Sequence, residues 1–470
     1  MKRLYTNTAK FDKNAVDVLG FSELVLQENA ARAVADLVRK ELKIGTKILA
    51  LCGKGNNASD AIAALRMLSG EYECGLVLLQ KELNRNAQIQ LNIAKNVGVN
   101  VLDLDSLSNF SEFDCIIDGI FGSGFCGEIG EKIAKIIKIA NSCSALKIAV
   151  DIPSGISENG AVAINGAFRA DFTVCMGALK LGLYADAAKD LVGQIVQANL
   201  GLNESKFSFD DSDFLVLLDD LILPSRDIEN VNKGDFGHAF IACGDMSGAA
   251  HIAANSALRM GAGRVSIVNL AKSIQGLSSL NLDPQIMLKS SFDGADAVAF
   301  GMGLGEVEFD FMNLLKKPCV VDADAFYKPW ICEFARSNKA ILTPHPKEFS
   351  SLLKICEIGE FDVSQIQNNR FELARKFSSK FLATLILKGA NPIIAQNGVL
   401  YIAPQGNAKL AVGGSGDALA GIILAYLAGG FSPLNSAING VLAHQKSAQI
   451  YKGNSYSFTP NDIIEGLKWL

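Results

Sequence analysis

The chain has 470 residues, of which 49% are apolar and 20% charged, enough for two hydrophobic cores of ordinary domain size. The formal net charge is −5, from 44 Lys and Arg against 49 Asp and Glu, which argues against nucleic acid as the main partner. The most apolar run, residues 418–431, contains three glycines and is too short to span a bilayer, so we expect no membrane segment.

The ten cysteines form no Cys-x-x-Cys pair, and several of them lie in apolar runs. They are therefore expected to be buried free thiols in a reducing compartment, without disulfide or metal roles. The basic start of the chain has no apolar stretch behind it, so the sequence predicts no signal peptide and a cytoplasmic protein.

Apolar runs, glycine-bearing turns and helical segments alternate in the first part of the chain, a rhythm typical of parallel sheets covered by helices. We expect an opening helix at about 14–42, and further helices such as 60–68 and 131–140. The predicted strands are residues 47–52, 75–79, 114–118, 146–151 and 171–176.

A less periodic, acidic stretch at 203–213 interrupts this rhythm, which then starts again. The strands predicted after it are residues 238–243, 264–268, 297–300, 319–322, 340–342 and 383–387. The sequence therefore predicts an α/β protein of two domains, residues 1–203 and 204–470. Ligands of parallel sheets bind beyond the carboxyl ends of the strands, so the loops after these strands are the candidate sites.

The first predicted strand ends in a glycine-bearing loop, Gly53-Lys54-Gly55-Asn56-Asn57-Ala58-Ser59-Asp60. Glycines let a backbone approach a ligand closely, and the N–H groups that open the following helix attract anions. The asparagine amides can bind a polar ligand or offer a carbonyl oxygen to a cation. The other interpretation is an ordinary tight turn in which Asp60 caps the helix.

Two later strands of the first half end in a carboxylate. Asp118 leads into a loop with four glycines, residues 119–127, and Asp151 leads into Ile152-Pro153-Ser154-Gly155. A buried carboxylate is costly unless it has a partner, and one such acid alone is commonly a helix cap. Two acids beside three glycine-bearing loops indicate one shared site.

These segments read Gly-Lys-Gly-Asn-Asn-x-x-Asp, Asp-x-x-x-Gly-Ser-Gly-x-x-Gly and Asp-Ile-Pro-Ser-Gly, and together they resemble the epimerase domain of NAD(P)H-hydrate repair enzymes. That family interconverts the R and S forms of NAD(P)H hydrated at nicotinamide C6. The resemblance implies a Rossmann-like three-layer α/β/α domain. It also implies a catalytic Asp151 against the substrate, potassium held by Asn57, Asp118 and Ser154, and substrate contacts from Asn56, Asn57, Ala58, Ser59, Asp60, Gly122, Ser123, Gly124, Phe125, Cys126, Gly127, Glu128 and Lys180.

The first loop departs from the usual pattern of the family at three positions, where Ala58, Ser59 and Ala61 replace glycines. Both Ala58 and Ser59 add a Cβ where a close approach of the phosphate could be needed. We expect the epimerase activity to persist, because the asparagines and the three acids remain.

The clearest signal in the second half is Gly413-Gly414-Ser415-Gly416-Asp417, which precedes a long apolar helix. Backbone N–H groups and the helix dipole converge there, which suits a phosphoryl group in transfer. Asp417 could take the proton of an attacking hydroxyl. The other interpretation is a glycine turn with Asp417 as a helix cap.

Gly-Gly-Ser-Gly-Asp resembles the anion-hole motif of ribokinase-like enzymes. Together with segments 244–250, 257–263, 301–305, 322–325, 343–346 and 387–390, it resembles the ADP-dependent NAD(P)H-hydrate dehydratase domain. The resemblance implies a ribokinase-like α/β/α domain that uses ADP with magnesium. It also implies a catalytic Asp417, hydrate contacts from Ala249, Gly303, His345 and Asp417, and ADP contacts from Lys388, Gly389, Ala390, Asn391, Pro392 and Gly416.

Some polar residues near these motifs keep two interpretations. His345 lies between two prolines after a predicted strand, and we favour a ligand contact over a structural role. Asp322, Asp324 and Glu348 could bind magnesium through water or cap helices. The other three histidines are expected to be structural.

The resemblance to both domains implies a bifunctional repair enzyme that epimerises hydrated NAD(P)H and dehydrates its S form, consuming ADP and giving AMP and phosphate. Two alternatives remain open: a ribokinase-like kinase for a small vitamin precursor, and a first half that serves only as a nucleotide-binding scaffold. The expected partners are the small-molecule nucleotides, and we also expect a homo-oligomer.

Overall fold

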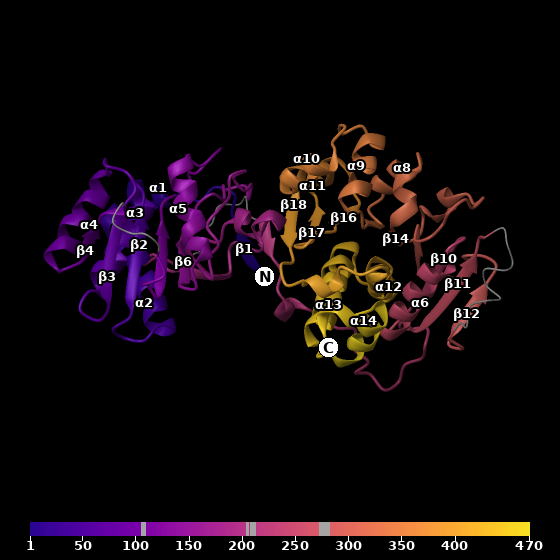
Figure 1. The fold of residues 1–470 in the computed structure, drawn as a ribbon. Coiled ribbons are helices and arrows are strands. Elements are labelled where there is room, and N and C mark those ends of the chain that lie inside the picture. Colours follow the sequence, from indigo (N-terminus) through magenta and orange to yellow (C-terminus); the bar gives the residue numbers. More distant parts are fainter. Residues whose placement is uncertain (105–109, 204–205, 207–212, 272–282) are drawn as a thin grey trace. The chain divides into compact units, whose positions relative to one another are not determined.

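The computed structural model describes residues 1–104, 110–203, 206, 213–271 and 283–470. The chain forms two compact units, Arg3–Ser212 and Asp213–Leu470, the second of which includes Met1–Lys2 (Figure 1). Each unit is a sheet with helices on both faces, so the predicted α/β fold class is confirmed. The predicted boundary after residue 203 adjoins residues outside the described part, and the predicted acidic break lies mostly in them.

The sheet of the first unit has seven strands, and all its pairings are parallel. Because parallel strands point the same way, the loops that follow them gather at one edge of the sheet. The spatial order is β4 (Asn100–Leu102), β3 (Glu73–Leu78), β2 (Lys47–Cys52), β5 (Cys115–Gly119), β6 (Leu146–Val150), β7 (Phe172–Met176) and β8 (Gln194–Ala198).

Helices cover both faces of this sheet, because successive side chains of its strands point to opposite sides. Along β2, Ile48 and Ala50 share a core with α2 (Glu23–Glu41), α3 (Asn56–Leu68) and α4 (Arg85–Asn96). Leu49 and Leu51 share a different core with α5 (Glu131–Ser142). The first unit is therefore a three-layer α/β/α structure.

The helix predicted at 14–42 is wrong, because the structure has two helices there, α1 (Ala9–Asp17) and α2. Gly20 has a φ of +77°, which ends α1, and the Ser22 hydroxyl accepts the Val25 N–H to cap α2. The helix predicted at 60–68 begins four residues earlier, at Asn56. Asp60 is therefore inside α3 and does not cap it.

The second unit contains a sheet of eleven strands. β17 runs antiparallel to β16 and β18, whereas all pairings from β16 to β12 are parallel. In spatial order the strands are β1 (Lys2–Leu4), β9 (Asp213–Leu215), β18 (Val399–Ile402), β17 (Ile393–Gln396), β16 (Thr384–Leu387), β15 (Ala340–Leu342), β14 (Cys319–Val321), β13 (Ala297–Phe300), β10 (His238–Cys243), β11 (Arg264–Asn269) and β12 (Ile286–Lys289).

Helices also cover both faces of this second sheet. One core joins Ala299 and its neighbours to α6 (Ser247–Arg259), α12 (Ser415–Ala428), α13 (Pro433–Ile450) and α14 (Pro460–Gly466). The next residue, Phe300, contacts the ring of Phe334 on the other side. The helices on that side are α8 (Ile331–Ala335), α9 (Pro346–Ile355), α10 (Val363–Asn368) and α11 (Arg370–Lys380) (Figure 1).

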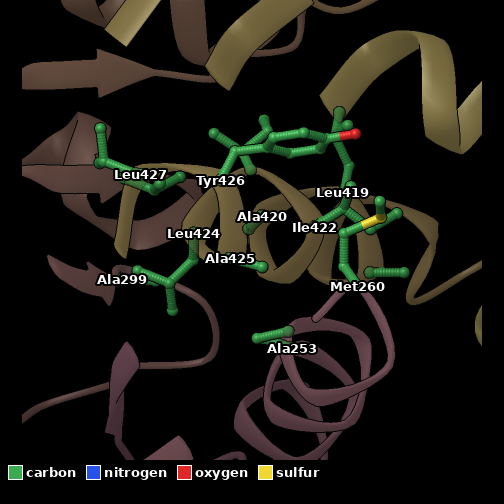
Figure 2. Close-up of a cluster of buried hydrophobic side chains, with 14 of the residues drawn as sticks. Ala253, Met260, Ala299, Leu419, Ala420, Ile422, Leu424, Ala425, Tyr426 and Leu427 are labelled. Carbon is green, nitrogen blue, oxygen red and sulfur yellow. The ribbon is translucent and has the colours of Figure 1, made fainter. Parts of the chain in front are cut away.

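Helix α12 is almost completely buried, and Figure 2 shows its apolar side chains packed against α6 and the sheet. Gly421 makes the close packing possible, since a Cβ there would lie 2.1 Å from the carbonyl oxygen of Ala253. The buried helix holds the glycine loop at its N-terminus in a fixed place. Within the described part of the chain, no helix is both long and apolar enough to cross a membrane.

Candidate active sites

A cavity of about 540 Å³ opens at the carboxyl edge of the first sheet. Loops that follow β2, β5, β6 and β7 line it, together with the start of α1. The structure therefore brings most of the predicted epimerase residues to one place. Those that line the cavity are Asn56, Asn57, Asp60, Gly122, Ser123, Gly124, Phe125, Asp151 and Lys180.

Two predicted residues of the first loop turn away from this cavity. Ala58 is fully buried in the core shared with α2 and α4, and the Ser59 hydroxyl donates a hydrogen bond to Gln27 Oε1 at 3.0 Å. Both residues have helical backbone, so neither position needs glycine. Of the predicted residues, Cys126, Gly127 and Glu128 also lie outside the cavity lining.

Ala58→Gly is expected to lower the free energy of unfolding by about 1 kcal/mol, because glycine is less favourable than alanine inside a helix and removes a buried methyl group. Urea unfolding followed by circular dichroism measures this difference. Lys43→Gly, in the exposed loop after α2, is a control that should leave the unfolding midpoint close to that of the parent chain. Equal or higher stability of Ala58→Gly would contradict the helical placement of this residue.

A buried ion pair forms one wall of the cavity. Lys180 Nζ lies 2.5 Å from Asp151 Oδ1, and both side chains are almost fully shielded from solvent. Burial disfavours the ammonium, but the neighbouring carboxylate outweighs it and raises the pKa of Lys180. Asp151 has a left-handed backbone with a φ of +69°, an uncommon conformation that aims its side chain at this site.

The three residues predicted to hold potassium lie close together, and one of them, Asn57, lines the cavity. Asp118 is fully buried and accepts hydrogen bonds from the Ser154 hydroxyl at 2.6 Å and the Ser154 N–H at 2.7 Å. Asn57 Nδ2 donates to the carbonyl oxygens of Phe121 and Val150, both at 2.7 Å.

Among the residues that the structure describes, the carboxylate of Asp118 has hydrogen-bond partners but no counter-charge. Burial raises its pKa to about 6, and hydrogen bonds from Ser154 and Ile120 oppose this shift. No cationic side chain in the described ranges pairs with it. A buried carboxylate beside a hydroxyl and two carbonyl oxygens is a set of hard donors that fits a hard cation.

Sequence reasoning missed the contribution of α1 to this cavity. Its N-cap Thr8 and its residues Phe11 and Asp12 line the wall, although the segment carries no glycine or strand end to mark it. Lys54 and Asn84 line the cavity as well. Only tertiary packing brings α1 to the sheet edge.

In the second unit, the predicted residues follow the carboxyl ends of five neighbouring parallel strands. Asp322 follows β14, His345 follows β15 and Lys388 follows β16. Ala249 lies in the first turn of α6, which follows β10, and Gly303 lies in the loop after β13; a Cβ at Gly303 would lie 3.4 Å from that of Ala249. Parallel strand ends thus bring the predicted hydrate contacts close to the acid and lysine residues.

The glycine loop is the N-terminus of α12, which begins at Ser415. Gly414 is its N-cap with a φ of +87°, so Asp417 lies in the first turn and is not the cap. The first-turn N–H groups of a helix have no partner within it. A Cβ at Gly416 would lie 3.6 Å from Lys388 Nζ and 3.7 Å from Asp322 Oδ2, so the lysine and the acid stand beside this nest.

Lys388 is the centre of a charge cluster. Its Nζ lies 2.7 Å from Asp322 Oδ1 and 3.7 Å from Glu348 Oε2. Burial raises the pKa of Glu348 to about 7, with Lys388 opposing and Asp322 adding to the shift. Burial, with a further contribution from Asp322, likewise raises the pKa of Asp417 to about 6 against the effect of Lys388.

His345 and the nearby acids make capping bonds. His345 Nδ1 accepts the Lys347 and Glu348 N–H groups at the start of α9, at 3.1 and 3.3 Å, while its ring remains half exposed. Asp322 Oδ1 accepts the Ala323 N–H, and Asp324 accepts the Gly305 N–H. These bonds fix the loops, and the predicted ligand contact of His345 stays a prediction.

Two residues support this site although neither was predicted to contact a ligand. Arg370 donates to the carbonyl oxygens of Leu387 and Lys388, at 3.2 and 3.1 Å, and so holds the turn that carries the predicted ADP contacts. His444, expected to be structural, lies 3.0 Å from the Ser415 hydroxyl under the glycine loop. Burial lowers its pKa to about 4, so the ring is neutral at physiological pH.

Comparisons with known proteins cover both units. Residues 239–468 match the NAD(P)H-hydrate dehydratase family, and residues 23–182 match the YjeF-related protein N-terminus. A bifunctional NAD(P)H-hydrate repair enzyme of Helicobacter pylori is 38% identical over 475 residues, with all of both chains covered. The enzyme of Escherichia coli with the same description is 32% identical over 467 residues, covering 93% of this chain and 87% of its own.

A crystal structure of an ADP/ATP-dependent NAD(P)H-hydrate dehydratase of Bacillus subtilis is 26% identical and covers 52% of this chain and 92% of its own, with a TM-score of 0.45. Because the similarity to these relatives extends over nearly the full length of the chain, the protein is of the class of two-domain nucleotide-repair proteins. The chain belongs to the family of bifunctional NAD(P)H-hydrate repair enzymes.

Proposed function

We propose that the chain epimerises the R and S forms of hydrated NAD(P)H in its first unit and dehydrates the S form in its second unit at the expense of ADP. The observation that carries the dehydratase proposal is the N-terminus of α12, where Asp417 stands beside Lys388 and Asp322. The observation that supports the epimerase proposal is the cavity of the first unit, which most of the predicted substrate residues line.

Dehydration is difficult because hydroxide is a poor leaving group. Asp417 would take the proton of the C6 hydroxyl while that oxygen attacks the terminal phosphate of ADP. The N–H groups of the loop at Gly413–Gly416 would hold the charge on the phosphoryl group, and AMP would leave. Loss of phosphate from C6 and of a proton from the ring then restores NAD(P)H.

Each unit also has a proposed ion. Magnesium would enter with the nucleotide phosphates, since this ion commonly binds through one or two carboxylates and substrate oxygens, and Asp322 and Glu348 are near enough to Lys388 to contribute them. Potassium would use the oxygens of Asn57, Asp118 and Ser154. Ten free cysteines support the proposed cytoplasmic location, and a homo-oligomer remains a proposal.

The deciding experiment mixes the full chain with hydrated NADH and either ADP or ATP. Recovery of the reduced-nicotinamide absorption band, with one AMP per NADH when ADP is supplied, is the expected result. A phosphate ester that accumulates without recovery of the band would instead support a small-molecule kinase. Binding of hydrated NADH without conversion of the R form would support a scaffold role for the first unit.

A further inference from the structure

The cavity of the first unit contains more carboxylates than the one that its buried ion pair uses. Three carboxylates line it, from Asp12 on α1, Asp60 on α3 and Asp151 after β6. Lys180 contributes the only buried ammonium of the lining, and it is paired with Asp151 at 2.5 Å. Lys54 also lines the cavity but is exposed. The other two carboxylates, of Asp12 and Asp60, therefore form no ion pair with a residue of the lining.

Of these two carboxylates, that of Asp60 is the more costly to ionise, because it is buried. It is 92% buried, and its Oδ1 is shielded from solvent without a hydrogen-bond partner. Burial raises its pKa well above the ordinary range, and the charges of Asp151 and Asp12 add to this shift. Asp12, by contrast, is exposed at the cavity wall; partial burial of its carboxyl group raises its pKa, Asp151 and Glu23 add to this shift, and Lys180 opposes it.

We infer that Asp60 is the proton donor of the epimerase reaction and that Asp12 is a positioning residue whose charge keeps the proton on Asp60. This inference rests on the epimerase activity proposed above and assigns the acid of that same site. The charged groups that act on this pair are Asp151, which affects both carboxyl groups, and Lys180 and Glu23, which affect Asp12. Lys54 lines the same cavity.

The chemistry follows from the hydrated ring, in which C6 carries both the hydroxyl group and the ring nitrogen N1. Asp60 gives its proton to the C6 hydroxyl, the C6–O bond breaks with its electron pair leaving as water, and the N1 lone pair forms an N1=C6 double bond. The ionised Asp151 and Asp12 face the resulting positive charge and stabilise it. Water then adds to the other face of C6 and returns a proton to the Asp60 carboxylate, so no other reactant is consumed.

The test uses the full chain with Asp60→Asn and, as a matched control on α1 away from the cavity, Asp17→Asn. Purified R hydrate is supplied without ADP, and the S form is measured by chromatography. Asp60→Asn should lower kcat about 10²- to 10⁴-fold with little change of KM. Asp17→Asn should equal the parent, and both variants should keep the urea transition of the first unit, followed by circular dichroism, as a control for its folding.

A pH profile tests the positioning role of Asp12. Because the charge of Asp12 raises the pKa of Asp60, Asp12→Asn should shift the loss of epimerase rate at high pH to lower pH while activity at low pH remains. If the epimerase rate of Asp12→Asn falls at the same high pH as that of the parent, this role of Asp12 is overturned.

The outcomes separate the inference from the proposed function. A parent chain that leaves the R hydrate unconverted would overturn the epimerase proposal and the inference with it. If the parent chain converts the hydrate and Asp60→Asn keeps the parental kcat, with or without a higher KM, the epimerase proposal is supported and the acid role of Asp60 is overturned.

Discussion

Asp417→Asn is expected to bind ADP but to dehydrate the S hydrate about 10²- to 10⁴-fold more slowly than the parent, because the amide cannot accept the hydroxyl proton. Asn has nearly the same size, so the N–H groups of the α12 N-terminus should keep their positions. Equilibrium binding of ADP and the rate of NADH formation measure the two effects separately. Asp293→Asn, in an exposed turn of the same unit, is the matched control and should behave as the parent.

The pH dependence provides a second readout of the same residue. Burial raises the pKa of Asp417 to about 6, and a base works only when it is ionised, so the dehydration rate of the parent should fall as the pH is lowered through about 6. In Asp417→Asn, the remaining slow dehydration should no longer show this fall at low pH. An asparagine variant with parental turnover, or with an intact acid limb, would remove Asp417 from the reaction.

Much of the fold could be predicted because buried parallel strands have a strong signature. Continuous apolar runs such as residues 47–52 and 238–243 correspond to β2 and β10, which are covered on both faces. The short strands β17 and β18 were missed, since an antiparallel hairpin of four-residue strands is hard to tell from a loop. The gap between α1 and α2 was missed because the helical pattern appeared continuous across Gly20.

The parts of the candidate sites that could be predicted are those that contain glycine-bearing loops or acids at strand ends. Asp118, Asp151 and Asp417 were found this way, because parallel topology brings strand ends to one edge. Asp12 and Arg370 have no such signal, since each reaches its site only through the packing of a whole helix. Whether position 58 needs a glycine could also be decided only from the structure, in which α3 begins at Asn56 and position 58 is helical.

The second large effect is expected for Lys180→Met, which leaves Asp151 as an unpaired, nearly buried charge. Breaking one side of a buried ion pair costs about 3–5 kcal/mol of stability, whereas exposed pairs contribute little. Lys40→Met, which removes the exposed pair with Glu41, is therefore the control and should not change the unfolding midpoint measurably. The loss should be confined to the first unit, which contains both members of the pair.

The chain offers a direct way to see which unit is destabilised. Both tryptophans, Trp330 and Trp469, belong to the second unit, so their fluorescence follows only its unfolding, whereas circular dichroism follows both units. Lys180→Met should move a urea transition seen by circular dichroism to lower urea while the tryptophan transition stays in place. Unchanged transitions by both probes would mean that the pair is not buried in solution.

The double variant Lys180→Met with Asp151→Asn separates the charge from the shape of the site. It carries no unpaired charge, and asparagine tolerates the left-handed backbone of position 151 better than most residues do. Most of the lost stability should therefore return, because replacing both partners removes the buried charge that the single change exposes. Epimerisation should be lost in the double variant, since neither the Asp151 carboxylate nor the Lys180 ammonium is left on that wall of the cavity. Recovery of stability without recovery of activity is the result that assigns this pair to chemistry as well as to folding.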